Sequence, residues 1–173
     1  MNYTTKAVIL CAGLALAACT SPDRFEGQDT GMSGGADAGM GTGLSGSAQD
    51  PQSPAYFQQS IGDRVLFAVD QSTLSREAEA TLNEQADWLS SNPDYNATIE
   101  GHADEQGTRE YNLALGARRA NAVQEYLVSR GVASNRLKVV SYGKERPIEI
   151  CSDESCYQQN RRAVTVLAAR AGS

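Results

Sequence analysis

Histidine is nearly missing from this chain of 173 residues, in which His102 is the only one. A zinc site is usually built from about three or four ligands rich in nitrogen and sulfur, so the shortage of histidine argues against a metal site. A Ser-His-Asp triad of the hydrolase type would need a nucleophile on a sharp strand-to-helix turn, and the sequence has no such motif. The sequence therefore predicts no metal, no cofactor and no catalytic residue.

Basic residues are also scarce, and long apolar runs are few. The chain has 15 Lys and Arg against 21 Asp and Glu, a net charge of −6 and a pI near 4.8. This balance excludes the basic patch that is typical of a nucleic-acid-binding protein. The apolar stretch from Ala7 to Ala15 is shorter than the roughly 20 residues that span a bilayer. Because it follows Lys6, it is typical of a secretory signal peptide, which we predict over residues 1–18.

The predicted signal ends in Leu16-Ala17-Ala18-Cys19, which resembles a bacterial lipobox. Such signals are cut before the cysteine, whose sulfur then carries a diacylglycerol. The alternative is an ordinary signal peptide followed by a chance cysteine. Thr20 comes next, whereas an aspartate there would resemble an inner-membrane retention signal. We therefore expect lipidation of Cys19 and a place in the outer membrane, facing the periplasm.

Cysteine is limited to four residues. Cys11 leaves with the predicted signal and Cys19 takes lipid, so Cys151 and Cys156 remain. Four residues separate these two, which differs from the spacing of a CxxC redox motif. In an oxidising periplasm, two nearby cysteines in a polar loop are expected to form a disulfide, with two free thiols as the alternative.

Large apolar residues are almost absent from residues 19–54. Eight of the chain's 16 glycines lie between Gly27 and Gly46, among Ser, Asp and Ala. Such a segment buries too little surface to offset its ordering entropy, so we predict a flexible linker of about 35 residues that reaches about 30–35 Å on average. Tyr56 and Phe57 follow it, and the sequence leaves open whether they pack on the domain or bind a partner.

Residues 55–173 carry the periodic patterns of one α/β domain. The nearly continuous apolar run Val65–Val69 predicts a well-buried strand. Ser75 precedes an amphipathic pattern that Asn92-Pro93 ends. The expected elements are strands at 65–69, 96–101, 137–141 and 163–167, helices at 75–90 and 109–130, and a loop with a helical turn at 151–160. The order β-α-β-α-β-(α)-β predicts an α+β sandwich, with helices on one face of a four-stranded mixed sheet.

The stretch from Glu100 to Val123 concentrates polar residues next to a short apolar stripe. Thr108 can cap the helix that follows, and Gly131 can stop it. Arg119 lies one turn after Leu115, which places it on or beside the apolar face. A guanidinium there needs a partner, because an unpaired charge near a core is costly. A structural arginine paired with a core carboxylate is therefore one interpretation.

The ordered motifs of this region and of the chain beyond it resemble the OmpA-like peptidoglycan-binding domain. They are closest to the version in the peptidoglycan-associated lipoproteins (Pal) of Gram-negative bacteria. The resemblance covers roughly residues 63–167 and implies a four-stranded α/β sandwich. Its motifs are Gly101-His102-Ala103-Asp104, Gly107-Thr108-Arg109-Glu110-Tyr111-Asn112, Leu115-Gly116-Ala117-Arg118-Arg119-Ala120, Ser141-Tyr142-Gly143, Pro147 and Asn160-Arg161-Arg162.

The resemblance implies a ligand that bears both ammonium and carboxylate, the amino-acid end of meso-diaminopimelate in the peptidoglycan stem peptide. Asp104 matches the family's ammonium-binding aspartate, and Arg119 matches the arginine that takes the carboxylate. Asp70 and Leu115 match pocket positions. Asp104 could instead only cap a turn. The proximity of Asp104 and Arg119 follows from the family and not from their spacing.

Three further residues match the family pattern, and two positions depart from it. Asn160-Arg161-Arg162 matches a motif that supports the pocket in the family, although it could also be a solvated corner before an edge strand. Val69 stands where an aromatic residue is usual, and Gln106 stands where arginine is common. Neither departure removes the charged pair, so we expect binding to persist.

The resemblance further implies membership of the Tol–Pal system. The chain would tie the outer membrane to peptidoglycan, exchange between the wall and TolB, and support outer-membrane constriction during cell division. A peptidoglycan hydrolase using His102 and Asp104 is the alternative. A flagellar-motor stator shares this domain but needs a retained transmembrane helix, which a processed lipobox argues against.

Overall fold

The computed structural model describes residues 46–170. The predicted signal peptide, the lipidation site Cys19 and most of the predicted linker lie outside the described residues. None of the helices within residues 46–170 is long and apolar enough to cross a membrane.

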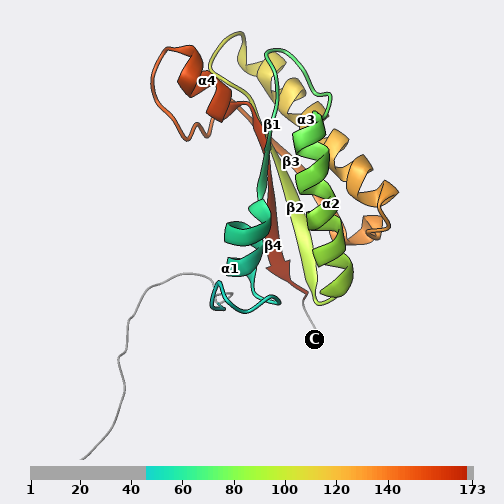
Figure 1. Cartoon of the computed structure of the whole chain (residues 1–173). Helices are drawn as coiled ribbons and strands as arrows, with labels where there is room; N and C mark the ends of the chain where they lie inside the picture. The colour runs from blue at the N-terminus through green and yellow to red at the C-terminus, as the bar shows by residue number, and fades with distance from the viewer. Residues whose placement is uncertain (1–45, 171–173) are drawn as a thin grey trace, which may run out of the picture. The chain divides into compact units, whose positions relative to one another are not determined.

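One mixed sheet of four strands forms the centre of the domain (Figure 1). Its strands are β1 (Arg64–Leu66), β2 (Tyr95–His102), β3 (Leu137–Gly143) and β4 (Arg162–Ala169), in the spatial order β1-β4-β2-β3. β2 and β3 are parallel, whereas β4 is antiparallel to both β1 and β2. The predicted fold class, an α+β sandwich on a four-stranded mixed sheet, is confirmed.

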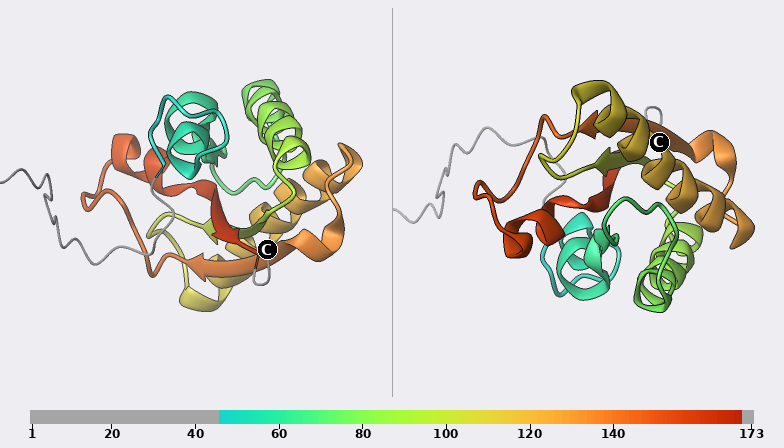
Figure 2. Two further views of the ribbon diagram at one scale, coloured as in Figure 1. Left: turned by 90° about the horizontal axis from the view of Figure 1, so that it is seen from below. Right: turned by 90° about the horizontal axis from the view of Figure 1, so that it is seen from above.

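Two long helices cover one face of this sheet. α2 (Arg76–Ser91) begins after Ser75, whose hydroxyl accepts a hydrogen bond from the Ala78 amide. α3 (Arg109–Ser129) begins after Thr108, which caps the Tyr111 amide in the same way. Figures 1 and 2 show α2 and α3 on one side of the sheet and the short α4 (Glu154–Asn160) on the other. The predicted helices are therefore placed to within about one residue at each end.

The core fills the space between the sheet and these helices. Its fully enclosed apolar side chains come from both layers and include Leu82, Leu89, Ile99, Ala120, Val123 and Leu127. Near the end of β2 the backbones of β2 and α3 approach very closely. A Cβ atom on Gly101 would lie 1.9 Å from the Gly116 carbonyl oxygen. Only glycine fits at this crossing, and it brings the start of α3 against the end of β2.

The chain before β1 is folded onto the domain. α1 (Pro54–Tyr56) leads into a π-helix, η1 (Phe57–Gly62). The Phe57 ring is fully buried, with its centroid 5.0 Å from that of Trp88. The Trp88 indole N–H donates to the Pro51 carbonyl at 2.7 Å. Residues 46–54, which the composition assigns to the linker, thus include contacts with the domain, and Phe57 belongs to its core.

The first strand differs from the prediction. We expected a well-buried strand over 65–69, but β1 ends at Leu66 and lies at the edge of the sheet. Val65 and Phe67 are buried, Leu66 is exposed and Val69 is 54% exposed. An edge strand with one face on the core alternates in this way. After the Phe67 amide donates to the Arg161 carbonyl, the chain leaves the sheet and carries its next residues toward α3.

Two short helical segments complete the chain. η2 (Ser134–Arg136) precedes β3 and was not predicted. α4 corresponds to the predicted helical turn between 151 and 160 and begins after Asp153, which caps the Ser155 and Cys156 amides. The structure joins Cys151 and Cys156 in a disulfide, with their Cα atoms 5.9 Å apart.

Candidate functional site

A cavity of about 310 Å³ opens where the ends of β1 and β2 meet the start of α3. Three of the four predicted ligand-binding residues line it, namely Asp70, Asp104 and Leu115. The two positions that depart from the family pattern, Val69 and Gln106, line it as well. The full lining is Val69, Asp70, Asp104, Gln106, Gly107, Tyr111, Asn112 and Leu115.

Asp104 supplies a buried carboxylate at the base of the loop after β2. Its side chain is 11% exposed. One carboxylate oxygen accepts a hydrogen bond from the Gln106 amide at 3.2 Å, so the predicted turn-capping role is real. The other oxygen lies 3.2 Å from an Arg161 nitrogen and forms an ion pair with it. Arg161, which we assigned only a supporting role, is therefore the direct charge partner of Asp104.

Asp70 supplies the second carboxylate of the cavity lining, from the loop after β1. Its backbone has φ +57°, and it is the only non-glycine residue with positive φ within residues 46–170. Aspartate is one of the few side chains enriched in this left-handed region. The Tyr111 hydroxyl donates to the Asp70 carboxylate, which joins the loop after β1 to the first turn of α3. This contact fixes one edge of the cavity mouth.

Arg119 lies behind the cavity and does not line it. The side chain is fully buried, and its three nitrogens donate to the carbonyls of Gln71, His102 and Ala68 at 2.8, 2.8 and 3.2 Å. Arg119 forms no ion pair with Asp104 among the contacts of the described region. Burial lowers the pKa of Arg119 to about 10, a shift that the charges of Asp104 and Asp70 oppose, so the guanidinium is charged at neutral pH.

The three carbonyls that Arg119 contacts lie on the loop after β1 and at the last residue of β2, directly before the loop of Asp104. Ala68 and Gln71 flank Asp70, and His102 is two residues before Asp104. The predicted structural partner of Arg119, a core carboxylate, is thus replaced by backbone oxygens. Arg119 positions both acidic side chains and places a positive charge behind them.

The Asn160-Arg161-Arg162 motif supports the same end of the sheet. The Asn160 side-chain oxygen accepts from the amides of Ile148 and Glu149, and Arg162 donates to the Arg146 carbonyl. All three side chains of the motif are buried. The alternative of a solvated corner is therefore wrong, because each of these side chains has a contact inside the domain.

Tyr111 and Asn112 belong to the cavity but were not predicted as site residues. Asn112 is 1% exposed, and its side-chain amide donates to the Gln106 carbonyl at 2.7 Å. It thereby fixes the loop that carries Asp104. Helical spacing could have found it, because Asn112 lies three residues before Leu115 and seven before Arg119, on one face of α3.

His102 does not contribute to the cavity. Its side chain is 2% exposed, and neither ring nitrogen has a hydrogen-bond partner within the described part of the chain. Burial lowers the pKa of His102 to about 4, and the nearby charges of Arg162 and Arg146 act in the same direction. The imidazole is therefore neutral at pH 7 and enclosed, which removes the geometry that a hydrolase using His102 and Asp104 would need.

Potential metal ligands gather at one place within residues 46–170, where Cys151, Asp153 and Cys156 lie close together. The two sulfur atoms are bonded to each other, so they are not available as thiolate ligands.

A larger cavity, of about 520 Å³, lies between the N-terminal segment and α2. No predicted site residue lines it, and its lining includes no cationic side chain. It is lined by Pro51, Gln52, Tyr56, Ile61, Glu84, Asp87, Trp88, Ser91 and Asn92. The smaller cavity is the better candidate because three of the predicted ligand-binding residues line it. Its positive charge comes from Arg161, which pairs with Asp104, and from the buried Arg119, neither of which is part of the lining.

Residues 66–162 match the model of the OmpA family. The chain is 51% identical to the peptidoglycan-associated lipoprotein of Rhizobium meliloti over 92% of this chain and 85% of that protein. It is 47% identical to that of Brucella melitensis over 93% of this chain and 90% of that protein.

Solved structures agree with this result. The peptidoglycan-associated lipoprotein of Burkholderia pseudomallei superposes with a TM-score of 0.62 at 39% identity, covering 70% of this chain and 98% of that one. The C-terminal domain of Helicobacter pylori MotB superposes with a TM-score of 0.59 over 63% of this chain and 86% of that one. At 21% identity the MotB likeness shows the fold alone.

Proposed function

The chain belongs to the OmpA family, and from this membership we propose that it is an outer-membrane lipoprotein that binds peptidoglycan without a covalent bond. Named relatives from Rhizobium meliloti and Mesorhizobium japonicum are peptidoglycan-associated lipoproteins that match it over most of their length. The chain is a binding protein and not an enzyme. The observation that carries the proposal is the cavity at the end of the sheet, which combines two carboxylates with a buried arginine.

The cavity suits a ligand that carries an ammonium group next to a carboxylate. Asp104 and Asp70 supply negative charge on two sides, and Leu115 supplies an apolar wall. We assign the ligand ammonium to Asp104, because its carboxylate is buried and fixed, and charge-assisted hydrogen bonds are the stronger ones. Such a ligand end is found on the diaminopimelate of a peptidoglycan stem peptide.

Arg119 provides the complementary positive charge. Arginine has five N–H donors in a rigid fork. Three carbonyl contacts leave donors on the guanidinium that no contact in the described region uses. Because Arg119 is fully buried and does not line the cavity, we propose that its charge attracts the ligand carboxylate from behind the cavity wall. Because the guanidinium is enclosed and held by three contacts, little ordering is needed when the ligand binds.

The remaining parts of the proposal concern the N-terminal region and partners. A lipid on Cys19 would hold the chain in the inner leaflet of the outer membrane, and more than one acyl chain makes such anchoring stable. A linker would let the domain reach the wall. We further propose that the chain acts in the Tol–Pal system, exchanges between peptidoglycan and TolB, and supports outer-membrane constriction and integrity during cell division.

Co-sedimentation with isolated sacculi tests the binding proposal. The full chain, purified in mild detergent, is compared with Asp104→Asn and Arg119→Lys. Each change removes a charge-assisted contact worth on the order of 1.5–3 kcal/mol, so we expect affinity to fall about 10- to 100-fold. Thermal unfolding of each variant reports whether the domain remains folded.

The chain offers matched controls at the opposite end of the sheet. Arg136 also donates to three backbone carbonyls, those of Tyr95, Leu89 and Asn92. Arg136→Lys should lower stability about as much as Arg119→Lys and leave binding unchanged. Asp87→Asn controls for loss of a negative charge. If both site variants pellet as wild type does, the assignment of Asp104 and Arg119 is wrong. If the wild type releases fragments from labelled sacculi, the chain is an enzyme.

A further inference from the structure

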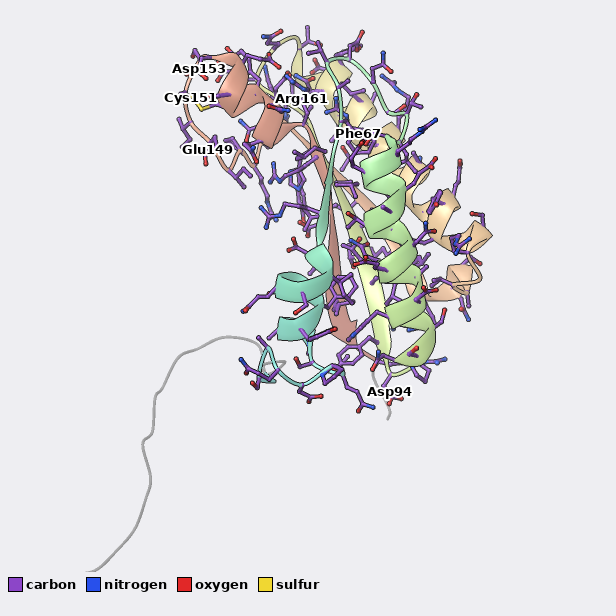
Figure 3. The ribbon with its side chains drawn as sticks, in the orientation of Figure 1. Phe67, Asp94, Glu149, Cys151, Asp153 and Arg161 are labelled. Carbon is purple, nitrogen blue, oxygen red and sulfur yellow. A yellow bond between two sulfur atoms is a disulfide. The ribbon has the colours of Figure 1, made fainter. Side chains whose placement is uncertain are left out.

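The loop that carries the cavity's buried aspartate is held from outside by the segment around α4. Figure 3 shows Cys151 and Asp153 at the beginning of α4 and Arg161 beyond its end, toward Phe67 and the end of β1. These residues lie about 50 positions after Asp104 in the chain. Of these residues, the assignment of the ligand site gives a role to Arg161 alone, as the charge partner of Asp104.

Glu105, which directly follows Asp104, is the first point of contact. Its carboxylate oxygen Oε1 accepts hydrogen bonds from the hydroxyls of Ser152 and Tyr157, both at 3.0 Å. The Lys144 ammonium donates to the Glu105 and Gly107 carbonyls from the other side, at 3.3 and 2.7 Å. Two side chains from the α4 segment thus fix the position of the loop.

Asp104 itself is the second point of contact. Arg161 is 3% exposed and donates to the Asp104 carboxylate, to the Glu154 carboxylate and to the Phe67 carbonyl. Glu154 is the first residue of α4. A guanidinium held between two carboxylates stays in one orientation, so Glu154 sets the orientation of the arginine that in turn fixes Asp104.

The disulfide encloses the residues that make these contacts. Cys151 and Cys156 are five positions apart, and Ser152 and Glu154 lie between them, while Tyr157 comes directly after. Asp153, also inside the closed turn, caps α4 through the amides of Ser155 and Cys156. The disulfide therefore limits the conformations of three side chains that act on Asp104 and Glu105.

We propose that the Cys151–Cys156 disulfide, the start of α4 and Arg161 form a clamp that holds Glu105 and so positions the neighbouring Asp104 carboxylate for the ligand. The side chains that make the contacts of the clamp are Ser152, Glu154, Tyr157 and Arg161. This inference rests on the proposed function, because the ligand ammonium is assigned to Asp104. The clamp residues act through Asp104 and Glu105 and are positioning residues. Removing the clamp lets the carboxylate of Asp104 turn away from the ligand, and affinity falls.

The test compares the full chain with Cys151→Ser/Cys156→Ser and with Ser152→Ala/Tyr157→Phe, which leaves the disulfide intact. Without ligand, amide hydrogen exchange of residues 104–107 should speed up about 10-fold in both variants. Affinity for sacculi should fall about 5- to 10-fold. A double-mutant cycle supplies the decisive readout. In an Asp104→Ala background, removing the disulfide should cause little further loss, because both changes disable the same carboxylate.

Tyr126→Phe is the matched control, since it removes a hydroxyl that donates at the same distance, 3.0 Å, to Asn83 far from the cavity. Unchanged exchange at residues 104–107 in both clamp variants overturns the clamp, as do additive losses in the cycle. If the disulfide variant fails to fold, the exchange rates and the affinity of Ser152→Ala/Tyr157→Phe still test the clamp. If the wild type fails to pellet with sacculi, the proposed function falls, while the exchange measurement still shows whether the clamp fixes the loop.

Discussion

Two buried arginines act near the cavity, and each has its own kind of partner. Arg119 binds only backbone carbonyls, and Arg161 takes the carboxylate of Asp104. Truncating either residue would leave buried polar groups without partners, at a cost of about 1–3 kcal/mol for each group. Loss of binding in an arginine variant is therefore informative only when its stability is measured as well. This is why Arg136 serves as the control.

His102 makes the stability of the domain depend on pH. Its pKa is lowered to about 4 in the folded state, mainly by burial, and is about 6.5 when the chain is unfolded. Between these values the unfolded state binds more protons, so the stabilisation is complete above pH 6.5 and is lost as the pH falls toward 4.

We expect the free energy of unfolding to fall by about 3 kcal/mol from pH 7 to pH 4 because of His102. Urea unfolding of wild type and of His102→Asn at several pH values measures the free energy of unfolding of each. Subtracting one from the other cancels the titration of the carboxylates, which both proteins share. Because His102 is the only histidine, its imidazole resonance can be followed alone by NMR. An imidazole pKa near 6.5 in the folded protein would contradict the prediction.

At the scale of elements, the close crossing of β2 and α3 is the most restrictive contact. A side chain on Gly101 would meet the Gly116 carbonyl carbon at 2.6 Å and its oxygen at 1.9 Å. Backbone atoms cannot turn aside as a flexible side chain can. The start of α3, with Tyr111, Asn112 and Leu115, is placed against the cavity by this approach.

Gly101→Ala should therefore destabilise the domain by about 3 kcal/mol or more, because β2 and α3 must separate. Gly131→Ala is the control. Gly131 has φ +101° but nothing within 4 Å of an added Cβ, so only backbone strain of about 1 kcal/mol is expected. Chemical denaturation measures both variants. Equal losses would mean that the crossing is not tight.

Local sequence signals predicted the elements well, and long-range partners poorly. The caps Ser75 and Thr108 mark both long helices because a cap needs only its own first turn. The extent of β1 was wrong, since the carbonyls after Leu66 are taken by an arginine about 50 residues away. The Asp104–Arg161 pair joins positions 57 residues apart, and no spacing rule reaches that far.

The site residues also fall into those that the sequence identified and those whose contacts depend on distant parts of the chain. Asp70, Asp104 and Leu115 were assigned from the resemblance to the family, and the structure brings them to one cavity. The interpretation of Arg119 as a residue near the core follows from helical periodicity. Which groups it would contact could not follow, because that depends on how two loops fold over it.

For the whole molecule, the candidate site and the N-terminal segment lie at opposite ends of the sheet. Trp88 near the end of α2 holds Pro51, and Tyr95, where β2 begins, pairs with Ala169, the last residue of β4. β2 then runs for eight residues, about 25 Å, to the loop of Asp104. Figure 1 shows α1 and the end of β4 at one end of the sheet and the start of α3 at the other.

We predict that residues 46–173 alone retain the stability and the wall affinity of the full chain. The residues that line the cavity lie within this part, and so do Phe57 and Trp88, which contact each other. A piece that begins at Asp63 should be less stable by about 3–5 kcal/mol, the usual cost of losing a buried aromatic residue such as Phe57. Calorimetry and co-sedimentation of both pieces measure this. Equal stability of the two would remove the N-terminal segment from the folded unit.

The placement of cavity and chain entry at opposite ends of β2 has a mechanical consequence. A protein held at the wall through its cavity and at a membrane through its N-terminus is pulled along the direction of the strands. The hydrogen bonds between strands run roughly across that direction and are loaded together, in shear. Within the sheet, the tension is shared among the bonds that pair β1 with β4, whereas peeling from one edge would break them one after another. The domain is oriented to bear load.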